Sequence, residues 1–325
     1  MKTNLLVFLL LLQVLVVSGQ DPHFTQYHAA PFSINPAYTG IFNGRARFIS
    51  NHRQQWASGV DPFITTSASL DMKLKSYTET GQNPFNIGLQ LMNDKSLKGA
   101  FRSSYVSATS SFHASLDADG IMSLGAGLMA TYANRRLDLN GLFFDNQFTS
   151  GGFLPDMASG ETSLQQLKPY FTIGAGMLFN YNNPSDKTFF ELGASIFNAN
   201  RPIFTTLQDS SQFVPVRYSL QASLQKYLGD QTLVNLRGLY QSQASVNYIL
   251  TGLSVSKLFG PDNINQAGVG FWYRTGDAFS PYLLLEFSNF MVGCSYDITI
   301  SSLKDAPKPM RSFELSLTVR MGNNR

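Results

Sequence analysis

The sequence predicts an all-β fold, a transmembrane antiparallel β-barrel of about 14 strands with a non-strand N-terminal segment on the periplasmic side. Only 14% of the 325 residues are charged and 13% are aromatic, whereas an ordinary soluble domain carries about a quarter charged residues. After the extreme N-terminus no apolar run is long enough for a spanning helix. Instead, short segments with alternating apolar and polar residues recur to the end of the chain, as in strands between lipid and a polar interior.

Residues 1–19 have the layout of a secretory signal peptide. Lys2 precedes an apolar run from Leu5 to Val17, and the small residues Ser18 and Gly19 follow. The run is shorter than the ~20 residues of a spanning helix, which disfavours an uncleaved anchor. No cysteine follows that could carry a lipid anchor. We therefore expect export to the outer membrane of a Gram-negative bacterium, with Gln20 as the mature N-terminus.

Residues 20–43 form a second unit, ahead of the barrel at 44–325. The segment contains three prolines and no sustained period of either kind, so it does not predict a strand. The six aromatic or histidine rings within residues 20–40 make a solvated tail improbable. We expect it to pack, either on the periplasmic side or as a plug in the lumen.

Alternating units fill the rest of the chain, and we count 14 of them, with 12 left open as an alternative. The last unit, Arg311–Met321, sets Phe313, Leu315 and Leu317 against polar neighbours and is expected to pair with the first. A β-sandwich would also alternate, but an almost uncharged apolar face favours lipid contact. The other units begin near Arg45, Ile64, Phe85, Val106, Met122, Phe171, Phe190, Val216, Val234, Tyr248, Ala267, Tyr282 and Phe290.

Loop lengths provide an independent test, because outer-membrane barrels alternate short periplasmic turns with longer outer loops. Counted from a periplasmic N-terminus, the long connections 134–167, 199–214 and 302–310 all fall outside. Both termini are then periplasmic. The expected inner turns are built of turn-forming residues and lie at 80–83, 117–120, 182–187, 229–230, 260–263 and 288–289.

Fourteen strands lie between the ~8 that fill with side chains and the 16–18 that leave an aqueous channel. The interior must then hold water or protein, and 20–43 is the nearest candidate for a plug. Cross-strand ion pairs in a hydrated lumen explain the inward charges better than catalysis does, and their basic excess would favour anions weakly or match an acidic plug. The predicted lumen-facing charges are Arg45, Arg47, Arg53, Asp71, Lys73, Glu191, Arg217, Arg237, Arg274, Asp297, Glu314 and Arg320.

No catalytic, cofactor or metal motif appears in a suitable context, so we expect no enzyme and no cofactor. A hydrolase would depend on His113 or His52. The single cysteine, Cys294, excludes an intramolecular disulfide and alternates with Val292 and Tyr296 on the apolar face, which predicts an inert lipid-facing thiol. A net charge of +3 is too small and scattered to indicate nucleic-acid binding.

Four stretches together resemble the PorP/SprF family of outer-membrane proteins associated with the type IX secretion system of Bacteroidetes. They are QDPHFTQY at 20–27 with SINPAYTG at 33–40, NHRQQW at 51–56 with 65–71, RLDLNGL at 136–142 with FDNQ at 144–147, and 289–301. The first is the most specific. One departure is Phe144, where a glycine is expected before Asp145.

The resemblance implies a role in protein secretion or in surface attachment of exported proteins such as adhesins, sometimes in gliding motility. The implied partners are outer-membrane lipid and either periplasmic secretion-ring subunits or a large exported surface protein. A passive porin or hydrophobic-solute channel stays as the alternative. The candidate partner-contact residues lie in the N-terminal segment and the largest outer loop: Asp21, Pro22, Phe24, Tyr27, Asn35, Pro36, Tyr38, Gly40, Leu137, Leu139, Phe144, Asp145 and Gln147.

Overall fold

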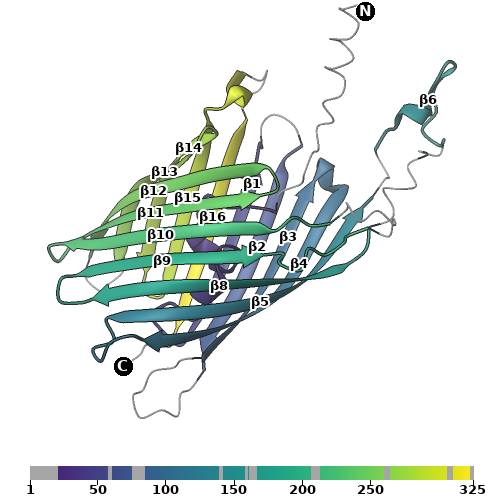
Figure 1. Ribbon diagram of the computed structural model, residues 1–325. Coiled ribbons are helices and arrows are strands. Elements are labelled where there is room, and N and C mark those ends of the chain that lie inside the picture. Colours follow the sequence, from purple (N-terminus) through teal and green to yellow (C-terminus); the bar gives the residue numbers. More distant parts are fainter. Residues whose placement is uncertain are drawn as a thin grey trace, which may run out of the picture.

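The computed structural model describes residues 21–57, 61–74, 85–138, 142–157, 160, 167–205, 213–259, 264–305 and 310–322. In this part of the chain, fourteen antiparallel strands form one closed barrel (Figure 1), which confirms the predicted fold class. The strands are β1 (Ala46–Gln55), β2 (Phe63–Lys73), β3 (Phe85–Ser96), β4 (Phe101–Ser115), β5 (Met122–Leu137), β8 (Tyr170–Asn183), β9 (Thr188–Phe197), β10 (Arg217–Leu228), β11 (Thr232–Gln243), β12 (Val246–Leu258), β13 (Gln266–Arg274), β14 (Ala278–Phe287), β15 (Phe290–Thr299) and β16 (Arg311–Met321).

The barrel closes where the last strand meets the first. Strand β16 pairs with β1 in a register that places Ala46 opposite Met321 and Gln54 opposite Phe313. The predicted closing pair is therefore confirmed. Strand β14 begins four residues before the predicted Tyr282, because Pro281 interrupts the pattern that marks a strand in sequence.

The two faces of the wall differ as the alternation predicts. Large apolar side chains such as Phe171, Leu128 and Val269 are 61–68% exposed on the outside, and Cys294 is also exposed. The inner face carries buried hydroxyl, amide and charged side chains. Among the described residues, no helix is long and apolar enough to cross a membrane.

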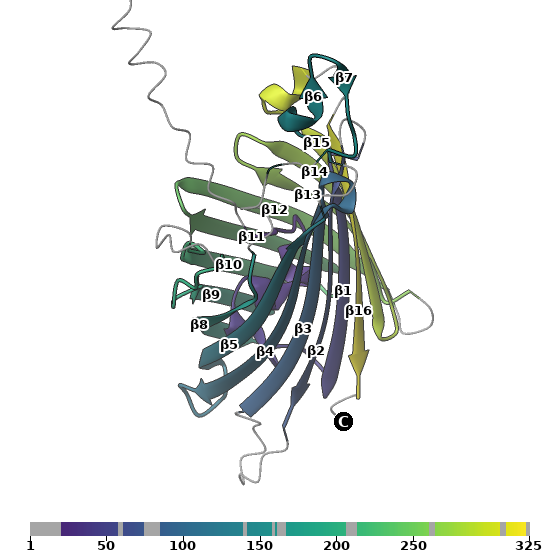
Figure 2. The same ribbon diagram turned by 90° about the vertical axis from the view of Figure 1, so that its right-hand side faces the viewer.

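The two ends of the barrel are distinct. The described connections at the end where β1 begins are short, for example 229–231 and 288–289, and we call it the short-turn end. The opposite, long-loop end carries the connections 138–169 and 198–216. The first of these contains a 3₁₀ turn, Asp145–Gln147, and a small hairpin of β6 (Phe148–Thr149) and β7 (Gly152–Phe153), which stands above the barrel in Figure 2.

Residues 21–43, which we call the strap, lie inside the barrel (purple in Figures 1 and 2). The strap forms three 3₁₀ turns, η1 (Tyr27–Ala29), η2 (Pro31–Ser33) and η3 (Pro36–Tyr38). Proline opens η2 and η3, where its missing N–H costs no hydrogen bond and its fixed φ suits a tight turn. This is why the segment crosses the interior as a chain of turns rather than as another strand.

Candidate functional site

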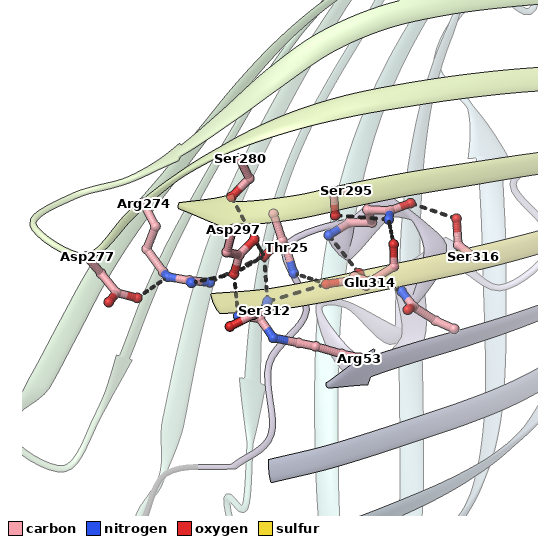
Figure 3. Close-up of polar contacts among 12 residues, drawn as sticks. Thr25, Arg53, Arg274, Asp277, Ser280, Ser295, Asp297, Ser312, Glu314 and Ser316 are labelled. Atoms are coloured by element: carbon pink, nitrogen blue, oxygen red, sulfur yellow. Dashed lines mark hydrogen bonds and ion pairs between the residues drawn. The ribbon is translucent and has the colours of Figure 1, made fainter. Parts of the chain in front are cut away.

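The inner wall binds the strap most tightly through one carboxylate. Glu314 of β16 is 1% exposed, and its two oxygens accept the backbone N–H of Thr25 at 2.7 Å and of Gln26 at 2.9 Å. The same carboxylate accepts from Asn51 at 2.9 Å and from Arg53 at 3.3 Å. Figure 3 shows this group at the seam of the barrel, so the strap is tied to both strands that close it.

A second carboxylate, Asp297 of β15, joins the same network (Figure 3). It forms ion pairs with Arg53 at 2.8 Å and Arg274 at 3.0 Å and accepts from Ser280 at 2.7 Å. Arg53 also donates to the Thr25 hydroxyl at 2.5 Å. Buried charges are tolerated when opposite charges and hydrogen-bond donors surround them. The network meets this condition with the strap in place, and Thr25 and Gln26 supply hydrogen bonds to Glu314, Asp297 and Arg53.

Gln26 occupies a site that satisfies its whole side-chain amide. Its nitrogen donates to the Ser295 hydroxyl at 3.1 Å and to the Glu314 carbonyl at 2.9 Å. Its oxygen accepts from the Ser316 hydroxyl at 2.7 Å. The side chain lies against Gly293, where an added Cβ would come within 2.4 Å of the Gln26 oxygen. The wall thus binds both the side-chain amide and the backbone N–H of Gln26.

Glycines on other inner strands make similar sockets. A Cβ on Gly127 would meet the backbone of Pro36 and Ala37 at 2.3–2.4 Å, and one on Gly176 would meet the Asn35 amide oxygen at 2.0 Å. The Asn35 side chain in turn donates to the carbonyl of Met177 at 2.8 Å and caps η3 by accepting from Ala37 at 2.9 Å. The glycines let strand and strap backbones approach closely, so the wall is shaped to this segment.

An aromatic cluster holds the middle of the strap. The rings of Tyr27 and His28 both lie with centroids 5.5 Å from that of Trp272 on β13, and the His28 ring stacks on the indole. The His28 ring also hydrogen-bonds the hydroxyl of Tyr282 at 3.2 Å. Phe24 and Phe32 are 2% and 0% exposed. Aromatic contacts of this kind add to the burial of apolar area that keeps the strap docked.

At the short-turn end, a third carboxylate binds the strap. Asp71 of β2 accepts the backbone N–H of Gly40 at 2.8 Å and forms a two-point ion pair with Arg47, at 3.0 and 2.9 Å. Arg47 also donates to the carbonyls of Tyr38 at 3.2 Å and Ile41 at 3.1 Å. The strap is therefore held by charged groups near both of its ends.

A chamber of about 560 Å³ remains between the strap and the wall on the short-turn side. Rings of Tyr27, Tyr38, Tyr181 and Tyr227 line it together with the guanidinium of Arg237. On the long-loop side, the cavity beside the strap has about 50 Å³. Of these two cavities beside the strap, the one on the short-turn side is the larger.

The structure places eleven of the twelve predicted charges on inward-facing positions of the strands. Arg45 is the exception, since it precedes β1 and is exposed at the short-turn end. Three inward charges escaped prediction: Glu286, which pairs with Arg320, Arg135, whose guanidinium lies over the rings of Tyr170 and Phe204, and Asp94, which accepts from the Thr65 hydroxyl at 2.6 Å. All three lie near strand ends, where the alternation is weakest: Glu286 follows three consecutive leucines, Arg135 stands between Asn134 and Arg136, and Asp94 between Asn93 and Lys95.

The strap residues predicted to contact a partner lie inside the barrel or at its long-loop rim. Phe24, Tyr27, Asn35, Pro36 and Gly40 are buried against the inner wall. The burial of these five residues follows from the apolar rings and the hydrogen bonds described above. The remaining three residues, Asp21, Pro22 and Tyr38, are half-buried.

In the outer loop, the predicted contact residues separate into two groups. Gln147 is buried, and its side-chain amide ties the loop together by bonding the N–H of Phe144 at 2.9 Å and the carbonyls of Pro155 and Met157 at 3.0 Å. Asp145 is exposed and Phe144 is half-buried. Leu137 ends β5, and Leu139 lies outside the described residues, as does the expected signal peptide.

Sequence reasoning missed the exposed rings of the same loop. Phe143, Phe148 and Phe153 are 64%, 62% and 41% exposed, and the centroid of Phe153 lies 4.9 Å from those of the other two. We call residues 142–157 the loop knob. Four phenylalanines in a segment of 16 residues that does not alternate could have indicated it.

His113 and His52, on one or the other of which a hydrolase would depend, lie in different places. His52 lies on the outer face, where it hydrogen-bonds Thr66 at 2.8 Å and contacts Phe313. His113 lies on the inner face beside Ser111. The barrel wall separates them. Within the described ranges, no group of three or more His, Cys, Asp or Glu residues could hold a metal ion.

Solved structures that match this chain include two toluene transporters and a FadL homologue. The toluene transporter TbuX of Ralstonia pickettii matches 90% of this chain and 94% of its own, with a TM-score of 0.51 and 9% identity. The P. putida toluene transporter TodX covers 89% and 93% with a TM-score of 0.47 and 9% identity, and a Pseudomonas aeruginosa FadL homologue covers 88% and 92% with a TM-score of 0.46 and 11% identity. At such identities, the match to TbuX supports the barrel fold alone. No curated protein matches the sequence.

The family is decided by the sequence as a whole. A family model described as "Type IX secretion system membrane protein PorP/SprF" matches residues 16–319, nearly the entire chain. The match includes the strap and all fourteen barrel strands except the last residues of β16. The chain therefore belongs to the PorP/SprF family of type IX secretion system membrane proteins.

Proposed function

We propose that this protein is a non-enzymatic outer-membrane component of the type IX secretion system that supports secretion or surface attachment of exported proteins such as adhesins, with gliding motility as one setting. The observation that carries the proposal is the family match over residues 16–319. The barrel fold agrees with an outer-membrane location. Its partners would be periplasmic secretion-ring subunits or a large exported surface protein.

The filled lumen supports a binding role over free diffusion of solutes. Strap residues Phe24, Phe32 and Asn35 are 0–2% exposed, and the hydrogen bonds to Glu314 and Asp71 hold both ends of the strap. A wall built this closely around an internal segment leaves little open path. Partner contacts would then be made at the rims of the barrel.

The loop knob is the best candidate contact at the long-loop end. Its three exposed phenylalanines form one cluster, Asp145 and Asp156 add negative charge, and no lysine or arginine lies within the knob. Exposed aromatic clusters with few cations are typical interaction surfaces. Gln147 keeps the knob folded, so the rings are presented in a fixed arrangement.

Quantitative proteomics of the medium and the cell surface, with and without this gene, tests the role. Loss of many secreted proteins at once indicates a core secretion component. Loss of one large surface protein indicates a dedicated attachment partner. An unchanged secretome and surface proteome would refute the proposal.

The loop assignment has its own test. Replacing Phe148 and Phe153 by serine removes exposed rings without touching the barrel strands, and we expect reduced retention of the partner at the cell surface. Replacing the neighbouring exposed Thr149 by alanine is the matched control. Unchanged retention in the double variant would remove the loop knob from the contact surface.

A passive porin or hydrophobic-solute channel is the second candidate, and the chamber of about 560 Å³ is the observation that favours it. The channel function predicts ion conductance or solute flux through the purified full-length barrel in planar bilayers. It also predicts an increase when Glu314→Gln loosens the strap. A barrel closed to ions and solutes in both forms would reject the channel.

A further inference from the structure

The first described residue of the strap is anchored at the long-loop end of the barrel. The backbone N–H of Asp21 donates to the side chain of Gln243 at 2.8 Å, and its carboxylate accepts from Asn198 at 3.0 Å. The same carboxylate lies 3.5 Å from Arg217. These partners stand at the end of β11, just after β9 and at the start of β10, which are all at the rim that carries the long loops.

The other end of the strap lies at the opposite rim. The backbone N–H of Gly40 donates to Asp71, and the carbonyl of Phe42 accepts from Lys73 at 2.5 Å. Lys73 ends β2, and the chain then enters β1 next to Gly322, whose carbonyl accepts from Arg45 at 3.1 Å. The strap therefore runs the full height of the lumen. Asp21 and Gly322 stand at opposite ends of the barrel.

The loop lengths indicate which end faces the cell exterior. Outer-membrane barrels keep short turns on the periplasmic side and long loops outside. The rim beside Gly322 carries the short connections 116–121, 184–187, 229–231 and 288–289. The rim beside Asp21 carries the loop knob and the connection 198–216.

We infer that the strap is threaded through the barrel so that Asp21 lies at the rim that faces the cell exterior, while Gly322 lies at the periplasmic rim. Asp21 and Pro22 then belong to the outer rim, on the same side as the loop knob. The expected periplasmic contacts of the N-terminal segment are thereby replaced by contacts at the outer rim.

Withdrawal of the docked strap from the lumen would break many of its contacts. Retraction toward the periplasm would pull the buried rings of Phe24 and Phe32 past the wall and would strip Glu314 of two backbone donors. Leaving buried charges and donors unpaired is strongly unfavourable. The threaded arrangement is therefore the resting state of the protein, and it is independent of which exported partner the barrel serves.

Cysteine labelling on intact cells tests the inference, since Cys294→Ser removes the single cysteine of the chain. In that background, three full-length variants carry one cysteine each: a short insertion between Gln20 and Asp21, Ser150→Cys in the exposed loop knob, and Asp119→Cys in an exposed short turn. We expect a membrane-impermeant maleimide to label the insertion and Ser150→Cys on intact cells. Asp119→Cys should react only after the outer membrane is permeabilised.

Two outcomes would overturn the inference. In one, the insertion reacts only with permeabilised cells, like Asp119→Cys; in the other, Asp119→Cys reacts on intact cells and Ser150→Cys does not. Pro22→Cys repeats the measurement without an insertion, at a half-buried residue. Labelling of Pro22→Cys from outside, slowed by its partial burial, supports the threading even if the inserted variant fails to assemble. None of these readouts requires the secretion partner, so the proposed function can fail while the threading holds.

Discussion

Glu314→Gln is the sharpest test of how the strap is held. The substitution keeps the shape of the side chain and turns one carboxylate oxygen into an NH₂ group. One oxygen of Glu314 accepts from Gln26 and Asn51, and the other accepts from Thr25 and Arg53. Whichever way the new amide turns, two buried donors lose their acceptor.

The size of the effect follows from that count. Each buried donor left unsatisfied costs about 1–3 kcal/mol, so two predict a loss of about 2–6 kcal/mol in the free energy of unfolding. Asp297 still pairs with Arg53 at 2.8 Å, which favours the lower half of this range. We expect the strap to loosen before the barrel opens, because the strands keep their own hydrogen-bond ladders.

Trp272 offers a direct assay, since its indole contacts Tyr27 and His28 of the strap. In a Trp56→Phe background it is the only remaining tryptophan. Urea unfolding of the full chain in detergent, followed by Trp272 emission, should give a lower midpoint and an early spectral change for Glu314→Gln. Glu286→Gln is the control, because Glu286 pairs with Arg320 and does not bond the strap. A loss below about 1 kcal/mol with unchanged Trp272 emission would refute the reasoning.

Three further changes probe the other contacts. Gly127→Ala places a Cβ against the backbone of η3 and should cost about 1–3 kcal/mol, whereas Gly238→Ala, with nothing within 4 Å, should be nearly neutral; equal unfolding midpoints would contradict the socket. Asp297→Asn removes the charge paired with two buried arginines and should cost about 3–5 kcal/mol; a fully stable variant in the same urea assay would be inconsistent with the network. Gln147→Ala removes three hydrogen bonds from the loop knob, worth about 1 kcal/mol each; limited proteolysis should cut the knob faster at an unchanged unfolding midpoint, and equal cleavage rates would count against its role.

The barrel was predictable because each strand carries its own evidence. In Arg311–Met321, alternate residues must suit lipid and interior in turn, and that pattern needs no knowledge of neighbouring strands. Strand starts were displaced where the pattern is interrupted, as at Pro281. Charges near strand ends, such as Glu286 and Arg135, were missed for the same reason.

The path of the strap could not be derived in this way. Thr25 and Glu314 are 289 positions apart, and no local pattern links them. The sequence around Gly127 or Gly176 also does not show whether the space beside the glycine is empty or is occupied by the backbone of another segment. The composition of the strap correctly indicated that it packs, but only the three-dimensional positions of its partners show where.

The distance in sequence between the strap and its binding groups has a consequence for biogenesis. Residues 21–43 are synthesised early, whereas Arg274, Asp297 and Glu314 are synthesised almost last. The buried hydrogen bonds of the strap can therefore form only after nearly the whole chain has been made. Contacts between residues so far apart in sequence form slowly, and the groups that make them stay unpaired until they form. A chain truncated before β15 would lack Asp297 and Glu314, two of the carboxylates that hold the strap. Docking of the strap can therefore act as a proofreading step that distinguishes complete barrels from incomplete ones.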